Sequence, residues 1–164
     1  MPDCLGCGLE VEGGLLKIKL DPADHIFCDS SAGVTNGLFY SNSQTAIIPT
    51  SETTTSGTFT DLATVGPSVS IQTGTIALAL FDAELTTSDS SFGAYMSVAV
   101  SGASTVAASV TYALFSFLQD NFWTLGYGVL LTGLNAGLNT FTAKYATDSG
   151  ATGTFRNRRL TVMA

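Results

Sequence analysis

The sequence predicts an all-β protein, with an N-terminal β-hairpin arm joined to an eight-stranded jelly-roll sandwich. Only 12% of the residues are charged, against about 25% in typical globular domains. Ser, Thr, Gly and Ala take their place, and these residues suit strands and turns better than helices. Short strand-like runs recur at even spacing with turn signals between them. No stretch combines helical periodicity with caps.

The first forty residues predict the arm. In GLEVEGGLLKIKLDP, apolar residues alternate with charged ones on both sides of Gly13-Gly14, which is typical of a β-hairpin. A lone hairpin is marginal in water, so we expect this acidic segment to dock on the main domain, a neighbouring subunit or a larger assembly. The next stretch is Ser/Thr-rich and predicts an extended linker. The expected divisions are 1–40 for the arm, 41–57 for the linker and 58–164 for a trimerising jelly-roll domain.

Eight strands in the main domain fit a jelly roll with two four-stranded sheets. Gly-Pro, Ser-Gly, Asp-Asn and polar runs separate them. The expected strands are Thr58–Ala63, Ser68–Gln72, Thr75–Leu85, Phe92–Val100, Val110–Leu118, Phe122–Leu131, Leu138–Tyr145 and Thr154–Met163.

Two of these strands change the parity of their apolar residues. In the third, Leu80 and Phe81 belong to opposite apolar rows, and in the last, Phe155 and Leu160 do. A β-bulge would reset the inward face. Alternatively both faces are covered, one by the core and one by a partner subunit. For the last strand we expect a kink near Asn157 that places Phe155 in one apolar layer and Leu160 in the other.

A basic cluster interrupts that last strand. Arg156, Arg158 and Arg159 are half of the six positive charges of the chain. We expect them at a rim of the sandwich, where long side chains pair with acids of a neighbouring subunit or of the arm. The alternative is a solvated basic patch.

The residues do not predict an enzyme. The one histidine is His25, and it lies in the acidic arm without the G-x-S-x-G context of a serine hydrolase. Asp82 and Glu84 share one face of a strand and could form a glycosidase pair, but two carboxylates so spaced are more typical of a solvated face. No nucleotide-binding or calcium-binding motif is present, and no cofactor is expected.

A zinc site is the sharpest chemical alternative. Cys4-x-x-Cys7 and His25-x-x-Cys28 could supply the four ligands of a structural tetrahedral site. The competing interpretation is three reduced thiols in a Gly-rich arm, because an odd cysteine count does not suggest a disulfide framework. We expect no bound metal.

An aromatic-dense stretch runs through the middle of the domain. A carbohydrate platform would need exposed rings, so packing in the core or at a subunit interface is the favoured interpretation. Its members are Phe115, Phe117, Phe122, Trp123 and Tyr127.

Charge narrows the class of partner. The net charge is −7, whereas nucleic-acid-binding domains are normally basic. Between Ser90 and Ala143 the only charged residue is Asp120, yet small polar residues interrupt every apolar run, so no transmembrane helix is expected. The first residues show no signal-peptide pattern, which favours synthesis in a cytoplasm. The charge-free tracts hold more apolar surface than one sandwich can bury, and therefore predict a homotrimer.

Several stretches together resemble one family of proteins. They are CLGCGLEVEGGLLKIKLDP, HIFCDSSAGVTNGLFY, DLATVGPSVSIQTGTIALALFDAEL, AYMSVAVSG and LTGLNAGLNTFTAKYATDSGATGTFRNRRLTVMA. The resemblance is to virion structural proteins of tailed bacteriophages that infect actinobacteria. It implies an N-terminal β-arm, a linker and a jelly-roll domain of the tumour-necrosis-factor and complement C1q type. It implies no enzymatic activity and no transferable site residues.

We therefore expect a capsid decoration protein on the virion surface, assembled in the host cytoplasm. Its arm would attach to the major capsid protein or another virion protein, and its jelly roll would trimerise. The alternative is a minor tail or fibre-tip protein that binds a host-surface glycan. A small virion hydrolase is a third and remote alternative.

Overall fold

The structure is a computed structural model that describes residues 9–12, 15–18 and 42–164. The chain divides into two compact units, Met1–Ser41 and Asn42–Ala164. In the first unit, strands β1 (Leu9–Glu12) and β2 (Leu15–Ile18) pair antiparallel. The predicted hairpin is confirmed, and Gly13-Gly14 separates its two strands.

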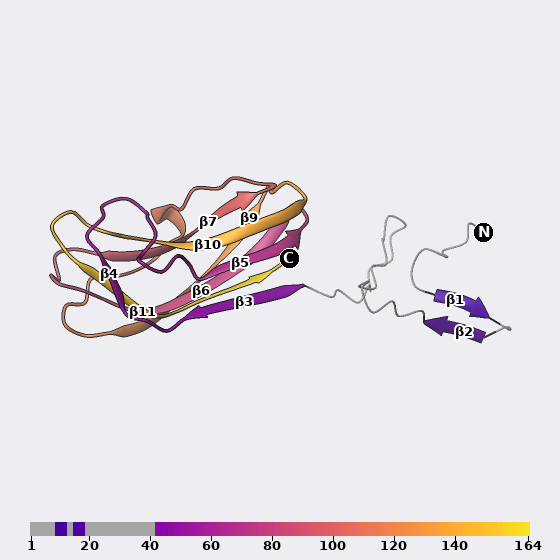
Figure 1. The fold of residues 1–164 in the computed structure, drawn as a ribbon, viewed down its shortest axis with the longest axis horizontal. Helices are drawn as coiled ribbons and strands as arrows, with labels where there is room; N and C mark the ends of the chain where they lie inside the picture. The colour runs from indigo at the N-terminus through magenta and orange to yellow at the C-terminus, as the bar shows by residue number, and fades with distance from the viewer. Residues whose placement is uncertain (1–8, 13–14, 19–41) are drawn as a thin grey trace. The chain divides into compact units, whose positions relative to one another are not determined.

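The second unit is a sandwich of two antiparallel sheets (Figure 1). The four-stranded sheet has the order β5 (Ser68–Thr73), β10 (Gly137–Thr147), β7 (Ala94–Gly102) and β8 (Leu114–Ser116). The five-stranded sheet has the order β3 (Ser43–Ile48), β11 (Gly153–Met163), β6 (Ile76–Thr87) and β9 (Trp123–Thr132), and β4 (Glu52–Thr54) also pairs with β11.

The strand pairing confirms the jelly roll. The innermost pair is β7 with β8, and around it β6 pairs with β9, β5 with β10, and β4 with β11. These are the nested pairs of one long antiparallel hairpin. Because successive pairs alternate between the two sheets, the hairpin is rolled into a sandwich, which is the jelly-roll arrangement.

The first strand of the sandwich is not where the sequence placed it. Residues 41–57, expected to be a linker, contain β3 and β4, which both pair with β11. The expected strand Thr58–Ala63 is reduced to one bridge, between Thr60 and Tyr145. Composition misled the prediction, because Ser and Thr are acceptable at the half-exposed positions of an edge strand as well as in a linker.

The other seven expected strands exist, with one substantial change of boundary. The run Val110–Leu118 divides into a 3-10 turn, η1 (Val110–Tyr112), and the short strand β8. The turn is capped by Ser109, whose side chain accepts a hydrogen bond from the backbone of Thr111. This local bond favours a turn where a strand had been expected.

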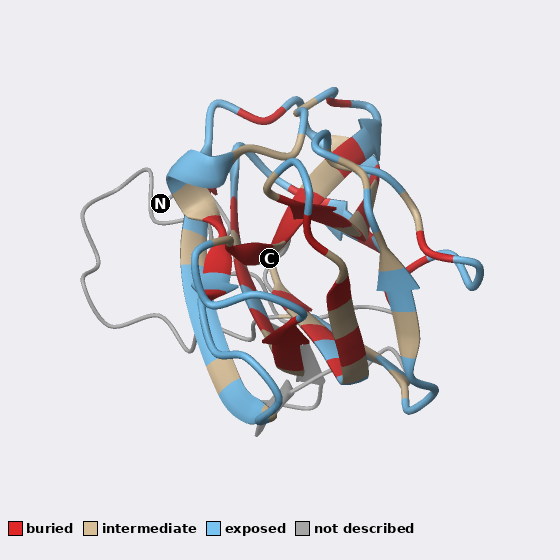
Figure 2. Cartoon of the chain, turned by 90° about the vertical axis from the view of Figure 1, so that its left-hand side faces the viewer, coloured by how far each residue is buried: buried red, intermediate tan, exposed pale blue. Residues whose placement is uncertain are grey.

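One core lies between the sheets. The strands carry alternating bands of buried and more exposed residues (Figure 2), as the twofold side-chain period of a strand requires. The buried residues of the four-stranded sheet include Val69, Met96 and Phe141, and those of the five-stranded sheet include Phe81 and Phe155. Among the described residues, no helix is long and apolar enough to cross a membrane.

Strand β6 contains no bulge. Its pairing with β9 is regular from Ile76 to Leu85, and its inward row is continuous through Ala79, Phe81 and Ala83. Leu80 therefore does not belong to a second inward row: it faces outward, and its side chain is 39% exposed. The bulge interpretation was wrong for this strand, and the outer face of β6 is apolar in its own right.

Strand β11 does contain the expected irregularity. Its register against β6 shifts between Arg156 and Arg159, and Asn157 has a φ of 50°, a conformation that Asn tolerates better than most residues. The expected consequence was wrong. The extra residue keeps Phe155 and Leu160 on the same inward face, and both are fully buried in one core.

Candidate interaction surface

The outer side of the five-stranded sheet carries an apolar surface. Cross-strand partners share a face, and Leu78 lies opposite both Leu130 of β9 and Met163 of β11. Ile76 is 54% exposed and Leu130 is 60% exposed. We call this surface the apolar face, and it consists of Ile76, Leu78, Leu80, Leu130 and Met163.

Two glycines hollow the sheet beside the apolar face. Gly126 and Gly128 occupy successive outward positions of β9, opposite Asp82 and Leu80. A shallow hollow is lined by these four residues together with Phe81 and Tyr127. A Cβ at Gly128 would lie 2.9 Å from Leu80 Cδ2, so the leucine leans over the glycine. Glycine inside a strand often marks a close approach of another chain.

Exposed aromatic residues lie on and beside two edge strands at one open side of the sandwich. Strands β8 and β9 are the edge strands of their sheets and contact each other. The rings of Phe115 and Phe117 meet edge to face, with centroids 5.5 Å apart. The exposed fractions of Phe115, Phe117, Trp123 and Tyr127 are 53%, 43%, 55% and 40%. We call these four residues the aromatic edge.

The exposure of these rings decides between earlier interpretations. Four of the five predicted aromatic residues are exposed, so full burial in the core is excluded for them. The ring of Tyr127 still packs on the core residue Phe81, with ring centroids 5.8 Å apart. Phe122 differs, because the guanidinium of Arg156 lies over its ring at 3.7 Å from the centroid. A subunit interface and a ligand platform are the interpretations that stay open for the aromatic edge.

Ion pairs border the apolar face on the outer side of β11 and β6. Arg156 Nε donates to Glu84 Oε2 at 2.7 Å, and Asn157 Nδ2 donates to Glu84 Oε1 at 2.7 Å. Arg159 Nε lies 3.8 Å from Asp82 Oδ2. The hydrogen bond from Asn157, followed by that from Arg156, lowers the pKa of Glu84. Asp82 and Glu84 therefore lie on a solvent-facing side of the sheet, as expected, and each pairs with an arginine of β11.

Arg158 lies on the other side of the same strand. Its side chain is fully buried, and Nη1 lies 3.3 Å from Glu52 Oε2. Nη2 donates to Thr50 Oγ1 at 3.1 Å, and the guanidinium lies 5.4 Å from the ring centroid of Tyr145. The hydroxyl of Tyr145 in turn donates to the carbonyl of Gly66 at 2.8 Å. This cluster fastens β4 and the loop that follows it to β11.

The electrostatics of Glu52 agree with that role. Burial alone would raise its pKa and is the largest single influence. Hydrogen bonds from the side chain and backbone of Thr64, with the positive charge of Arg158, together outweigh burial, so the pKa lies below its usual value. The carboxylate is thus held ionised inside the cluster.

The prediction for the basic cluster was wrong in its partners. All three arginines pair within the chain, with Glu84, Glu52 and Asp82, and none needs an acid of a neighbouring subunit or of the arm. Arg158 is neither at a rim nor part of a solvated patch. The bulge explains why: one extra residue turns Arg158 inward while its neighbours stay outward. Sequence reasoning missed Glu52, because it lay in the presumed linker.

The outer side of the four-stranded sheet is chemically different. Ser70 Oγ and Thr140 Oγ1 are 2.8 Å apart, and Ser68 Oγ and Thr142 Oγ1 are 2.9 Å apart. Gln72 extends the row along β5. We call these five residues the hydroxyl face. Such side chains satisfy one another and water, so these five residues need no partner. Leu138, the cross-strand partner of Gln72, lies on the same side and is 54% exposed.

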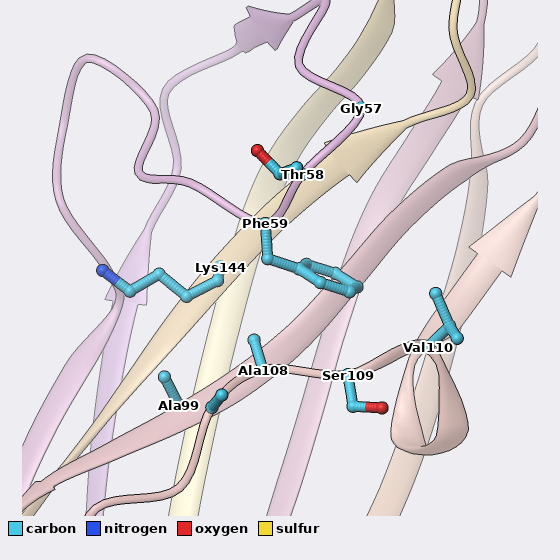
Figure 3. Close-up of a pocket in the computed structure, with 9 residues that line it drawn as sticks. Gly57, Thr58, Phe59, Ala99, Ala108, Ser109, Val110 and Lys144 are labelled. Atoms are coloured by element: carbon cyan, nitrogen blue, oxygen red, sulfur yellow. The ribbon is translucent and has the colours of Figure 1, made fainter.

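A groove lies beside the hydroxyl face (Figure 3). Small residues of β7 and of the loop before η1, including Ala99 and Ala108, line it together with Phe59 and Val110. The amine of Lys144 is turned away from the Phe59 ring in this view, and it pairs with both carboxylate oxygens of Asp61 at 2.7 Å. The groove therefore offers apolar contact but no free charge from Lys144.

The predicted zinc ligands lie outside the described residues. This applies to Cys4, Cys7, His25 and Cys28, so the zinc alternative and the role of His25 stay predictions. Among the described residues, no three metal-ligating side chains gather in one place.

Comparison with known proteins assigns the chain to no family. No protein-family model and no curated protein sequence match it. A structure of infectious bursal disease virus, Gx strain, is similar with a TM-score of 0.43 and 12% identity over 90% of this chain and 40% of that chain. A family two carbohydrate esterase from Cellvibrio japonicus is similar with a TM-score of 0.27 and 13% identity over 76% of this chain and 34% of that chain.

Likenesses this weak carry no argument about function. This chain also spans less than half the length of either of those chains. The fold and the surfaces define residues 42–164 as an all-β jelly roll whose five-stranded sheet carries an apolar outer face that no other described residue covers.

Proposed function

We propose that the chain is a structural component of a tailed-phage virion, a capsid decoration protein on the particle surface that assembles as a homotrimer. The observation that carries this proposal is the apolar face, with Ile76 and Leu130 more than half exposed. A contiguous apolar surface of this kind marks a protein interface. A decoration protein would cover such a surface by oligomerising and by binding other virion proteins.

The resemblance of the sequence supports the same function. It implies an arm followed by a jelly roll of the tumour-necrosis-factor and C1q type. The hairpin β1–β2 and the nested strand pairs of the sandwich agree with that expectation. We propose that the arm is the element that attaches to the major capsid protein or to another virion protein, and that the role is structural rather than enzymatic.

The aromatic edge favours a second candidate function. Exposed rings such as Phe115 and Trp123 are also what a glycan-binding surface requires. A minor tail or fibre-tip protein that binds a host-surface glycan is therefore the alternative. The T-shaped arrangement of Phe115 and Phe117, at 74°, presents no common flat surface on which a sugar ring could stack, so the decoration role is the better supported.

Labelling of phage particles with an antiserum against the sandwich tests the proposal. We expect many copies distributed over the head, and removal of residues 1–40 should leave a folded sandwich that no longer binds particles. A few copies confined to the tail tip would replace the decoration role with the alternative. Undiminished binding by the truncated protein would contradict the role given to the arm.

A further inference from the structure

Strand β3 is an open edge of the five-stranded sheet. It pairs with β11 on one side, and among the described residues no strand pairs with its other side (Figure 1). We propose that this edge binds β3 of a second copy of the chain. The two strands would run antiparallel with Thr45 at their centre, and they would join the five-stranded sheets of the two copies into one.

The hydrogen bonds between β3 and β11 show which backbone groups of β3 are left over. Asn42 and Ala164 exchange both of their backbone hydrogen bonds, at 3.1 and 3.0 Å. Along an antiparallel pair, such bonded positions alternate with positions whose N–H and C=O point away from the partner strand. In the observed register these are Ser43, Thr45 and Ile47. Their backbone donors and acceptors therefore point out of the sheet at its edge.

The sequence of β3 lacks the features that usually protect an edge strand. Charged residues, proline, bulges and short length are the common protections against pairing with another chain. Strand β3 has six residues, SQTAII, with no charge and no proline, and its register against β11 does not shift. The other strand on this side of β11 is β4, which has three residues and carries Glu52. An added strand is therefore best accommodated at β3.

Strand β3 is complementary to itself when inverted about Thr45. Thr45 then lies opposite Thr45 of the second copy, and Ser43 lies opposite Ile47. All three outward-pointing positions become hydrogen-bonded pairs in this register. A shift by one residue would place outward-pointing groups opposite groups that already bond to β11. Thr–Thr pairs stabilise neighbouring strands, and the side chain of Ile47, which is 58% exposed, becomes partly covered.

Charge favours a second copy as the occupant. Residues 42–50 carry no charge, whereas the whole chain has a net charge of −7. Copies with this net charge repel each other, and the repulsion is smallest where neither copy presents a charge. The contact lies in the plane of the sheet, so it leaves the apolar face available for the proposed trimer. A contact between two six-residue strands is small beside the ~1,200–2,000 Å² of stable interfaces, so we expect weak, concentration-dependent pairing.

Substitutions at Thr45 with a matched control test the inference. Thr45→Lys brings two like charges together at the centre of the contact. Thr45→Pro removes an outward N–H but no hydrogen bond to β11. We expect each to raise the dissociation constant of pairing on the order of 10-fold or more. Ser70→Lys adds the same charge to the hydroxyl face and should leave it unchanged. Analytical ultracentrifugation over a concentration series measures association, and circular dichroism checks folding.

A disulfide can trap the proposed register. In a chain whose Cys4, Cys7 and Cys28 are replaced by serine, Thr45→Cys places two thiols on opposite residues. The Cα atoms of such a pair lie about 5.5 Å apart, which suits a disulfide. We expect mild oxidation to cross-link two chains through Thr45→Cys and to leave the Ser70→Cys control unlinked. Equal cross-linking of both variants would contradict a specific contact at β3.

The outcomes separate this inference from the proposed trimer. Pairing of trimers through β3 gives species larger than a trimer. Pairing of single chains gives dimers, which would support the inference and overturn the trimer. A trimer that forms no larger species and no Thr45→Cys cross-link overturns the inference while the trimer stands. If Thr45→Lys weakens binding to phage particles but not self-association, the strand that covers β3 belongs to another protein, and a second copy is ruled out.

Discussion

The two outer faces of the sandwich share one core but obey different sequence patterns. In β5 and β10, inward apolar residues alternate with outward Ser and Thr, as in Ser68-Val69-Ser70. In β6, inward Ala79 and Phe81 alternate with outward Leu78 and Leu80. Alternation of apolar and polar residues is typical of an antiparallel sheet with one side in solvent. Apolar residues on both sides are typical of a sheet that is covered on both sides.

From this difference between the two outer faces we infer that the partner surface is the outer side of the five-stranded sheet. Both faces are built from strands of similar length within one fold, so the fold alone gives no reason for an apolar outer row. Among the described residues, nothing covers the apolar face. We propose that the apolar outer row of β6 and β9 serves the assembly, and the substitutions below test how far it differs from a surface that serves the single chain.

The largest effect on stability should come from Arg158, whose charge is paired inside the single chain. Arg158 and Arg159 are neighbours on β11, but the first is fully buried against Glu52 while the side chain of the second is 53% exposed. Arg158→Ala removes a fully buried cation from the half-buried Glu52 carboxylate and should lower the free energy of unfolding by about 3 kcal/mol, the lower end of the effect for a buried pair. Arg159→Ala should cost about 0–1 kcal/mol. Urea denaturation measures both, and equal losses would contradict the assignment of inward and outward sides.

The loss of stability in acid should depend on two carboxylates, Glu52 on the inner side of the sheet and Glu84 on its outer side. The pKa values of Glu52 and Glu84 both lie below the usual value, which is about 4.3 in an unfolded chain. Their contribution to stability is thus fully present above that value and is lost as the pH falls through the lower folded pKa.

Salt distinguishes the two sites. We expect Glu52→Gln to flatten the acid limb of the stability–pH curve at both low and high ionic strength, because its site is largely shielded from solvent. Glu84→Gln should flatten it only at low ionic strength, because exposed charges are screened. Thermal melting between pH 2 and pH 6 checks this. A Glu52 effect that vanishes in salt would contradict a shielded ion pair between Glu52 and Arg158.

The smallest effect on the single chain should come from filling the hollow. In Gly126→Ala the new Cβ would meet Asp82 Cβ at 3.6 Å, an ordinary contact, and alanine favours a strand over glycine by roughly 0.5–1 kcal/mol. In Gly128→Ala the tip of Leu80 must move, which offsets that gain. Both should fold normally yet weaken self-association.

A matched control exists in the turn before β6. Gly74 has no atom within 4 Å of an added Cβ, so Gly74→Ala should change neither stability nor association appreciably. Analytical ultracentrifugation of the three variants is the measurement. Association that is unaffected by Gly126→Ala and Gly128→Ala would show that the hollow stays open in the assembly.

The sequence by itself determined the fold class and most of the strands. Period-two alternation is a local signal, and it located β5, β6, β9, β10 and β11 to within a few residues. Turn signals such as Gly13-Gly14 are equally local, and the hairpin they predicted is confirmed. The charge-free tract that contains β9 also indicated an apolar surface in excess of what one core can hold.

Only the tertiary structure decided which side each residue takes. A bulge at Asn157 turns Arg158 into the core and keeps Phe155 in line with Leu160, and no local pattern distinguishes that bulge from a change of face. The first strand was missed because β3 and β4 become strands through their pairing with β11, which lies about a hundred residues or more away in the chain. Pairing over such a separation leaves no mark in composition, whereas alternation within one strand does.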